Sequence, residues 1–293
     1  MAIDITAGFP EHWQPSARAG GAVDWGAAGV SKKYVLLITG RCGSTNLAEL
    51  LGGRRICGQP AEYFNELYVS EYPEAQASRN LLGYISNLAA TRNAGGIFGF
   101  KIDFWRLEAL DRLVDFDALF PSSDTRLFVM TRRDIVAQAY SFAVARATGQ
   151  WHEVGGTGGG VREHVPDDGA LWREALLIAS AETGLAGFLR ARGRSAEALC
   201  YEDLLAGPDA MLSRIFGALA VEGAGADQSS GYQSVLPSTK GPVRKIRYSS
   251  RDDQIKTFRS RYGTLLADLE QQRHCLSWHE MAGRLTAEHG LVL

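Results

Sequence analysis

The first residues whose types could do chemistry lie at positions 39–45, which read TGRCGST. Two glycines let a chain turn tightly, so that several backbone N–H groups converge on one point. Ser44 and Thr45 add hydroxyl donors, and Arg41 adds a guanidinium that forms charge-assisted hydrogen bonds. A helix that follows would add free N–H groups and a positive dipole end. The segment predicts a socket for a phosphate or sulfate. A plain capped glycine turn is the alternative, and it leaves the arginine unexplained.

The same segment does not fit the phosphate loop of ATP and GTP enzymes. That motif has four residues between its glycines and a lysine before the final Ser or Thr. Here two residues, Arg41 and Cys42, separate the glycines, and no lysine precedes Ser44. No clear aspartate for magnesium follows either. An atypical nucleotide kinase is therefore a weaker alternative.

A second set of anion ligands lies at positions 131–141, which read TRRDIVAQAYS. Arg133 ends an expected strand, and Ser141 follows eight residues later, about two turns up the next expected helix. At this spacing both side chains could bind one anion that lies over the helix. The alternative is that Arg132 and Arg133 are surface arginines that pair with Asp134.

Alternating strands and helices must position these two segments. Short apolar runs predict buried strands at 34–38, 97–102, 127–130 and 198–201. Helical spacing of apolar residues predicts helices at 45–51, 134–148 (with Asp134 as its cap), 171–192, after Pro208 and at 254–272. This alternation implies an α/β protein with a parallel sheet and helices on both faces. With no repeat or linker, residues 33–293 are expected to form one domain after an N-terminal extension, residues 1–32.

Composition bounds the partners and the compartment. The 293 residues include 31 Lys plus Arg and 33 Asp plus Glu, a net charge of −2, which gives no global reason to bind nucleic acid. The longest apolar runs have five residues, whereas a membrane span needs about 20, so none is expected. The N-terminus does not resemble a secretory signal. Four scattered cysteines are expected to be free thiols in a cytoplasmic protein, and no cluster demands a metal.

Together, the two anion-binding segments resemble the sulfotransferases that use 3′-phosphoadenosine 5′-phosphosulfate (PAPS). In that family a strand–loop–helix holds the 5′-phosphosulfate, and an Arg and a Ser eight residues apart hold the 3′-phosphate. Gly40 stands where the family loop often has proline. The resemblance implies a P-loop-type three-layer fold and the product 3′,5′-adenosine bisphosphate. It assigns cofactor binding to Arg41, Cys42, Gly43, Ser44, Thr45 and Asn46, and to Arg133 and Ser141.

Further motifs are similar to the bacterial trehalose-type sulfotransferases, which sulfate hydroxyls of carbohydrates or glycolipids. The motifs that match, in the order of that family, are CGQPAEYF at 57–64, FGFK at 98–101, the segment 132–141, TGQWH at 148–152 and YEDL at 201–204. The likeness spans roughly residues 34–219. It implies in-line, metal-independent transfer of a sulfuryl group from PAPS to a hydroxyl of a carbohydrate, glycolipid or other small metabolite. It leaves a homodimer open.

Such a transfer needs a base for the acceptor hydroxyl. Glu62 is the first candidate, because the trehalose-type enzymes place a catalytic glutamate at this motif position. Its neighbours Tyr63 and Phe64 could desolvate the carboxylate and raise its pKa. Asp103 is the second candidate, near the position of a catalytic histidine in the eukaryotic cytosolic sulfotransferases, and His152 is the third. The alternative for Glu62 is a surface carboxylate.

The departing phosphate needs positive charge, which Arg41 and Lys101 could supply. Lys101 ends an expected strand, and its alternative is an exposed strand-end lysine. Arg244 and Lys245 belong to a basic cluster at 240–247. In sulfotransferases a late basic loop often closes over the 3′-phosphate, so both residues are candidate cofactor ligands. A solvated charged loop is the alternative.

The acceptor is the least determined part of this interpretation. Acceptor pockets are expected in the loops at 65–95, 149–170 and 222–250, with the glycine-rich run at 155–160 as a candidate lid. The candidate acceptor-binding residues are Tyr63, Phe64, Trp151 and His152. A member of the family that binds the nucleotide without turnover is a further alternative to an active enzyme.

Overall fold

The computed structural model describes residues 3–13, 22–151, 153–154, 164–221, 243–244, 251–273 and 278–291, with the backbone alone at 153–154, 243–244 and 278–279. The chain divides into two compact units. Unit 1 comprises Met1–Ile38, Gly43–Thr131 and Arg194–Pro242; unit 2 comprises Thr39–Cys42, Arg132–Gly193 and Val243–Leu293. The expectation of a single domain over 33–293 stays a prediction.

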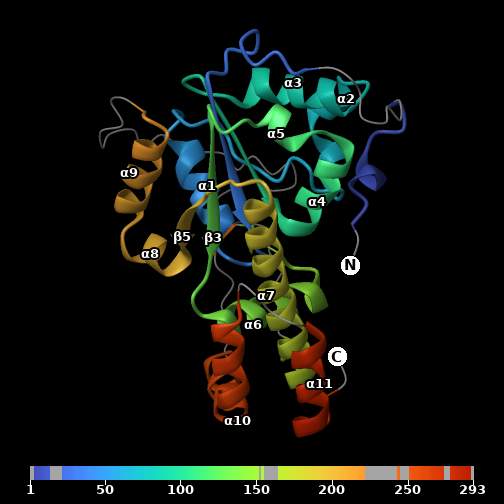
Figure 1. Ribbon diagram of the computed structural model, residues 1–293, viewed down its shortest axis with the longest axis vertical. Helices are drawn as coiled ribbons and strands as arrows, with labels where there is room; N and C mark the ends of the chain where they lie inside the picture. Colours follow the sequence, from blue (N-terminus) through green and yellow to red (C-terminus); the bar gives the residue numbers. More distant parts are fainter. Residues whose placement is uncertain are drawn as a thin grey trace. The chain divides into compact units, whose positions relative to one another are not determined.

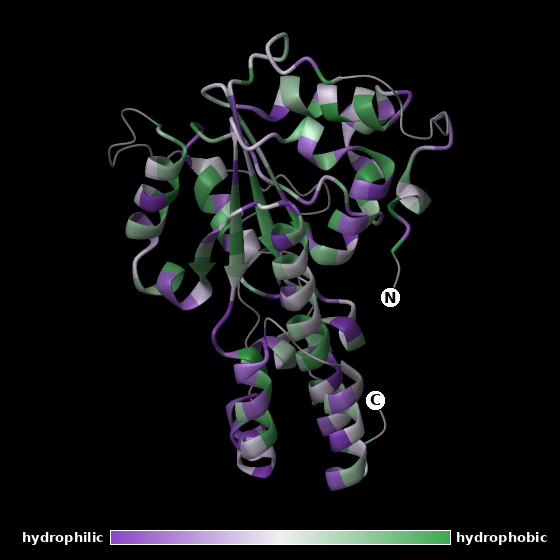
Figure 2. Cartoon of the chain, in the orientation of Figure 1, coloured by the Kyte–Doolittle hydropathy of each residue, from purple (hydrophilic) through white to green (hydrophobic). Residues whose placement is uncertain are grey.

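Unit 1 is built on a parallel four-stranded sheet. Its strands are β1 (Lys32–Ile38), β2 (Ile97–Asp103), β3 (Thr125–Thr131) and β5 (Glu197–Cys200), in the order β2-β1-β3-β5. The four predicted strands are therefore confirmed, as is the α/β class. Every residue of β1 after the first is buried, which explains why the central strand reads as a continuous apolar run. Figure 2 shows these hydrophobic stretches in green.

The register of the sheet gathers the functional segments at one edge of unit 1. Ile38, the last residue of β1, pairs with Asp103 of β2 and with Met130 of β3, so the carboxyl ends of the three strands coincide. In open parallel sheets, ligands bind beyond this edge. Helix α1 (Ser44–Gly53) follows β1, and α4 (Phe104–Leu113) follows β2; they lie on opposite sides of the sheet (Figure 1).

Further short helices lie between the strands of unit 1 and after β5. They are η2 (Val69–Glu71), α2 (Pro73–Gln76), α3 (Leu81–Arg92), α5 (Phe116–Leu119), α8 (Tyr201–Ala206) and α9 (Pro208–Ala218). The segment 65–95, expected as acceptor loops, is thus largely helical. Pro73 starts α2, and the side chain of Asn80 caps α3 by accepting a hydrogen bond from the Gly83 N–H.

The described parts of the N-terminal extension pack against unit 1. The short 3-10 helix η1 (Ile5–Gly8) buries Ile5, and the indole N–H of Trp13 donates to the Ala75 carbonyl at 2.9 Å. Val30, just before β1, is also buried. These contacts fasten residues 3–13 and 22–31 to the sheet unit.

In the described part of unit 2, four helices pack around one core. They are α6 (Ile135–Thr148), α7 (Asp168–Ala191), α10 (Arg251–Gln271) and α11 (Trp278–His289), with a small antiparallel pair of β4 (Glu153–Val154) and β6 (Val243–Arg244). Aromatic and aliphatic side chains such as Tyr140, Trp172 and Phe258 fill the core. The expected cap of α6 is confirmed, since the Asp134 carboxylate accepts from the Ala137 N–H at 2.8 Å. Among the described helices, none has an apolar stretch long enough to cross a bilayer.

Candidate active site

The loop that precedes α1 is divided between the two units, with residues 39–42 in unit 2 and residues 43–45 in unit 1. In unit 1, Gly43 is the N-cap residue of α1 and has a φ of 87°, in the left-handed region. No side chain caps this helix, so an external acceptor can bind the N–H groups of its first turn. Ser44 is buried there, and Thr45 is partly exposed. Asn46 is exposed.

Gly43 is required for two separate reasons. The left-handed backbone costs other residues roughly 1–2 kcal/mol, and a Cβ on Gly43 would lie 2.2 Å from the Tyr201 ring. We expect Gly43→Ala to lower the free energy of unfolding by about 2 to 4 kcal/mol in denaturant titrations. Gly29→Ala is the control, because Gly29 has a φ of 73° and no neighbouring atom within 4 Å. Equal losses in both variants would show that the Tyr201 contact has no effect.

Lys101 contacts two other predicted site residues within unit 1. Its ammonium donates to the Thr45 hydroxyl at 2.9 Å and lies 3.2 Å from a Glu62 carboxylate oxygen. The side chain is only 2% exposed, so Lys101 is not the exposed strand-end lysine that the sequence left as an alternative. A backbone hydrogen bond from the Lys101 N–H to the Ala61 carbonyl fastens the Glu62 segment to β2. The charge of Lys101 is therefore shared between the start of α1 and the candidate base.

Both oxygens of the Glu62 carboxylate are oriented by neighbours. Lys101 contacts Oε1, and the amide of Asn65 donates to Oε2 at 2.9 Å. Burial by itself raises the pKa of Glu62, but Lys101, the Asn65 hydrogen bond and Arg106 outweigh it and hold the pKa below its usual value. The expectation that the pKa of Glu62 is raised overall is wrong, because the buried Lys101 ammonium, Asn65 and Arg106 together outweigh the effect of burial. A quarter of the side chain is still exposed.

Asp103, the second candidate base, is engaged in structural contacts. Its carboxylate caps α4 by accepting from the Arg106 N–H at 3.1 Å, and it also pairs with the Arg106 guanidinium. The same guanidinium donates to both oxygens of Glu66, at 2.8 and 2.6 Å. Burial raises the pKa of Asp103, and the attraction of Arg106 does not fully offset this. A catalytic role for Asp103 stays a prediction.

Tyr63 and Phe64, predicted to contact the acceptor, lie in the core of unit 1. Tyr63 has no exposed surface and its hydroxyl donates to the Gln59 carbonyl. The Phe64 and Phe100 rings pack in an edge-on arrangement at a centroid distance of 5.1 Å. In this structure both rings therefore fix the segment that carries Glu62. Contact of either ring with an acceptor stays a prediction.

In unit 2, Arg41 connects the two predicted anion-binding segments. Its Nε donates to the Ser141 hydroxyl at 3.0 Å, and Nη1 donates to the Trp151 carbonyl. Arg41 has a φ of 63°, a left-handed conformation that is unfavourable for a residue with a Cβ. Gln138 on α6 supports the turn by donating to the Gly40 carbonyl at 2.8 Å. The arginine of the first motif thus lies against the serine of the second.

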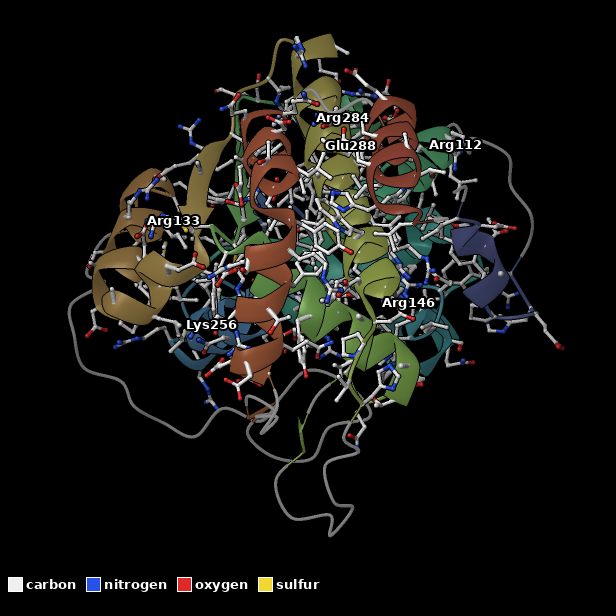
Figure 3. All side chains as sticks on the ribbon, turned by 90° about the horizontal axis from the view of Figure 1, so that it is seen from below. Arg112, Arg133, Arg146, Lys256, Arg284 and Glu288 are labelled. Carbon is white, nitrogen blue, oxygen red and sulfur yellow. The ribbon has the colours of Figure 1, made fainter. Side chains whose placement is uncertain are left out.

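The two arginines before α6 differ in exposure. Arg132 is buried, and Arg133, labelled in Figure 3, is exposed. Asp134, besides capping α6, accepts from Arg259 of α10 at 2.6 Å. The backbone carbonyls of Arg132 and Arg133 accept hydrogen bonds from Arg273. The exposed Arg133 side chain is therefore carried by a turn whose backbone is fixed by hydrogen bonds from Arg273.

The remaining predicted site residues are either at least partly buried or not fully described by the structure. Cys42 is buried, and the partly exposed Trp151 ring meets Phe142 at 5.8 Å. His152, Lys245 and the 155–160 run lie outside the described residues, and Arg244 is described only as backbone in β6. In the part of the chain that the structure describes, no three His, Cys, Asp or Glu residues gather as a metal site would require. Metal independence stays a prediction.

A protein-family model, Stf0 sulphotransferase, matches residues 33–230. The chain belongs to this family. No curated protein sequence matches the chain. Membership confirms the resemblance to the trehalose-type sulfotransferases and fits the parallel α/β sheet of unit 1.

As an Stf0 sulphotransferase, the protein transfers a sulfuryl group from a sulfate donor to a small-molecule acceptor. The matched range contains both anion-binding segments and the contact of Lys101 with Glu62. Helices α10 and α11 of unit 2 lie beyond it.

Proposed function

We propose that this Stf0 sulphotransferase moves the sulfuryl group of PAPS to a hydroxyl of a carbohydrate, glycolipid or other small metabolite, with Glu62 as general base. The observation that carries the proposal is the position of Lys101 between the Thr45 hydroxyl and the Glu62 carboxylate. This contact links an anion-binding helix start to a group that can accept a proton. Stabilisation of the departing phosphate and removal of the acceptor proton could thereby take place at one edge of the sheet.

The side chains present suit a donor that carries two separate anionic groups. In unit 1, Ser44, Thr45, Lys101 and the uncapped first turn of α1 offer hydrogen-bond donors and positive charge. The carboxylate beside them is balanced by the ammonium of Lys101. In unit 2, Arg41, Ser141 and Arg133 offer a second donor set. When bound, PAPS would supply the sulfuryl group and leave as the bisphosphate.

The roles of the residues follow from their charges. Because its pKa is lowered, Glu62 is ionised at neutral pH and can accept a proton. Lys101 and Asn65 each occupy one lone pair of its two oxygens, so lone pairs are left to face an acceptor hydroxyl. Lys101 and Arg41 oppose the negative charge that develops on the phosphate side. As in phosphoryl transfer, positioning and charge stabilisation account for most of the catalysis.

Calorimetric titration with 3′,5′-adenosine bisphosphate, ADP and ATP–magnesium tests the donor. We expect the bisphosphate to bind most tightly. Arg133→Ala is expected to weaken it roughly tenfold to a hundredfold, because a hydrogen bond to a charged group contributes about 1.5–3 kcal/mol. Ser141→Ala is expected to have a smaller effect. Arg112→Ala is the control, since Arg112 is exposed on α4 (Figure 3) and belongs to neither donor set.

The same titration separates the alternatives. Binding of ATP–magnesium without the bisphosphate would overturn the sulfotransferase proposal in favour of a nucleotide kinase. Tight binding of the bisphosphate together with no transfer from PAPS to any sugar, glycolipid or small hydroxylated acceptor would instead indicate a nucleotide-binding member without turnover. An equal loss in Arg112→Ala and Arg133→Ala would remove Arg133 from the phosphate site.

A further inference from the structure

Arg273 follows α10, outside the range that the family model matches, and is buried. Every one of its five N–H groups has a partner. Nε and Nη2 donate to the two oxygens of Glu182, at 2.8 and 2.7 Å. Nη2 also donates to the Arg132 carbonyl at 2.7 Å, and Nη1 donates to the Arg133 carbonyl at 3.0 Å and to Glu270 at 3.2 Å.

The pair of Arg273 and Glu182 is costly to bury. Only 1% of the Glu182 side chain is exposed, and removing both charges from water offsets most of their attraction. A well-packed apolar pair of similar size would stabilise the fold about as well. The main chain of Arg273 is held too, because the Thr183 hydroxyl donates to its carbonyl at 3.1 Å. Such a fully satisfied pair is better explained by what it orients than by stability.

What it orients is the short segment between β3 and α6. That segment belongs to no strand or helix, so its carbonyls need other donors. Arg273 supplies two, and the Ile135 N–H supplies a further one to Arg133 at 2.9 Å. These bonds set the point from which the Arg133 side chain leaves the backbone, relative to α6. Ser141 lies about two turns along that same helix.

We propose that Arg273 is a positioning residue for the donor nucleotide. With Glu182 it fixes the backbone from which Arg133 reaches the 3′-phosphate. The inference rests on the proposed function, in which Arg133 binds that phosphate. It also gives the region beyond the family match a part in donor specificity, through an arginine that does not itself touch the ligand.

The variant Arg273→Lys keeps the charge but cannot supply five hydrogen bonds in a planar fork. We expect it to weaken 3′,5′-adenosine bisphosphate about tenfold in calorimetry and to raise the KM for PAPS by a similar factor. The kcat should change less than about threefold, since the reacting groups are untouched. Glu182→Gln should behave in the same way. Hydrogen exchange of the amides at 131–137 should become faster in both variants.

Glu174→Gln is the matched control. Glu174 also lies on α7 and is 2% exposed, and it receives two hydrogen bonds from Arg146, at 2.8 and 3.2 Å. Arg146 is in the last turn of α6, at the end opposite Arg133; Figure 3 shows both. We expect a similar loss of thermal stability but an unchanged Kd for the bisphosphate. An equal loss of affinity in Glu174→Gln and Glu182→Gln would overturn the proposal, because general loosening of unit 2 would then explain both.

A double-mutant cycle tests whether Arg273 acts through Arg133. In the Arg133→Ala background, Arg273→Lys should cost no further affinity for the bisphosphate, because the side chain that it positions is absent. Additive losses would overturn the proposal. A wild-type protein that does not bind the bisphosphate would refute the proposed function. Hydrogen exchange of the amides at 131–137 would then test whether Arg273 fixes this backbone. Faster exchange in Arg273→Lys than in Glu174→Gln would support that role, and equal exchange would reject it.

Discussion

Glu62→Gln is expected to lower kcat by about a hundredfold or more, because an amide cannot take the proton of the acceptor hydroxyl. The side chain keeps its shape, but its single oxygen can accept from only one of the two donors, Lys101 and Asn65. Affinity for 3′,5′-adenosine bisphosphate should hold or increase, since Lys101 loses the carboxylate that balances its charge. Steady-state rates with saturating PAPS, set beside calorimetric Kd values, measure the two effects separately.

Glu74→Gln is the control for this change. Glu74 is a buried carboxylate of unit 1, its pKa is lowered against the effect of burial by hydrogen bonds from Arg92 and Thr91, and it has no place in the proposed site. Its replacement should reduce stability without reducing kcat by more than about threefold. If Glu62→Gln keeps the wild-type rate, Glu62 is not the base, and Asp103→Asn becomes the next variant to assay. Equal rate losses in Glu62→Gln and Glu74→Gln would point to general disturbance of unit 1.

Strands β1 and β2 of unit 1 were predictable because they are buried on both faces. The run at 34–38 has no polar residue, and the structure buries it as the central strand. Helices α2 and α3 are different. Their start signals, Pro73 and the cap residue Asn80, are single residues. Such single-residue signals are weaker evidence for a helix than apolar residues that recur at helical spacing, and the segment was therefore expected to be loops.

The chemistry of the site was predictable as residue types in chain order, but not as contacts. Nothing in the sequence says that Lys101 lies between Thr45 and Glu62. The direction of the Glu62 pKa shift depends on that contact, because the aromatic neighbours alone favour the opposite direction. Asn65 lies three residues after Glu62, a spacing that could have identified it. Arg273 gives no such signal, because the sequence around a single arginine does not show whether its side chain is buried or exposed.

Lys101→Met is expected to lower kcat by about a hundredfold to a thousandfold, the range seen when one charge-stabilising donor is removed. Two effects combine in this variant. The phosphate side of the reaction loses a cation, and Glu62 loses the ammonium that lowers its pKa. If Lys101→Met loses rate but keeps the wild-type pH profile, the loss of the cation on the phosphate side alone explains the lower kcat.

The pH profile identifies the second effect through its sign. In the wild type the lowered pKa keeps Glu62 ionised below the usual glutamate range of about 4.3, so activity should persist to low pH. The stability that the ionised carboxylate contributes is likewise present above its unfolded pKa and is lost as pH falls through the folded pKa. Without Lys101 the burial of Glu62 is offset only by Asn65 and Arg106, so its pKa rises and the acid limb of kcat/KM moves to higher pH.

Lys33→Met is the matched control for this shift. Lys33 is a buried lysine on β1 that pairs with Asp124 at 2.7 Å, and in the sheet it is opposite Phe98, near the amino end of the strand that carries Lys101. Its loss should destabilise the fold and leave the acid limb where it is. A Lys101→Met enzyme whose acid limb coincides with that of Lys33→Met would mean that the ammonium does not set the charge of Glu62. The titrating group that sets the acid limb would then not be the carboxylate that lies 3.2 Å from Lys101. The assignment of Glu62 as base would in that case depend on the rate of Glu62→Gln alone.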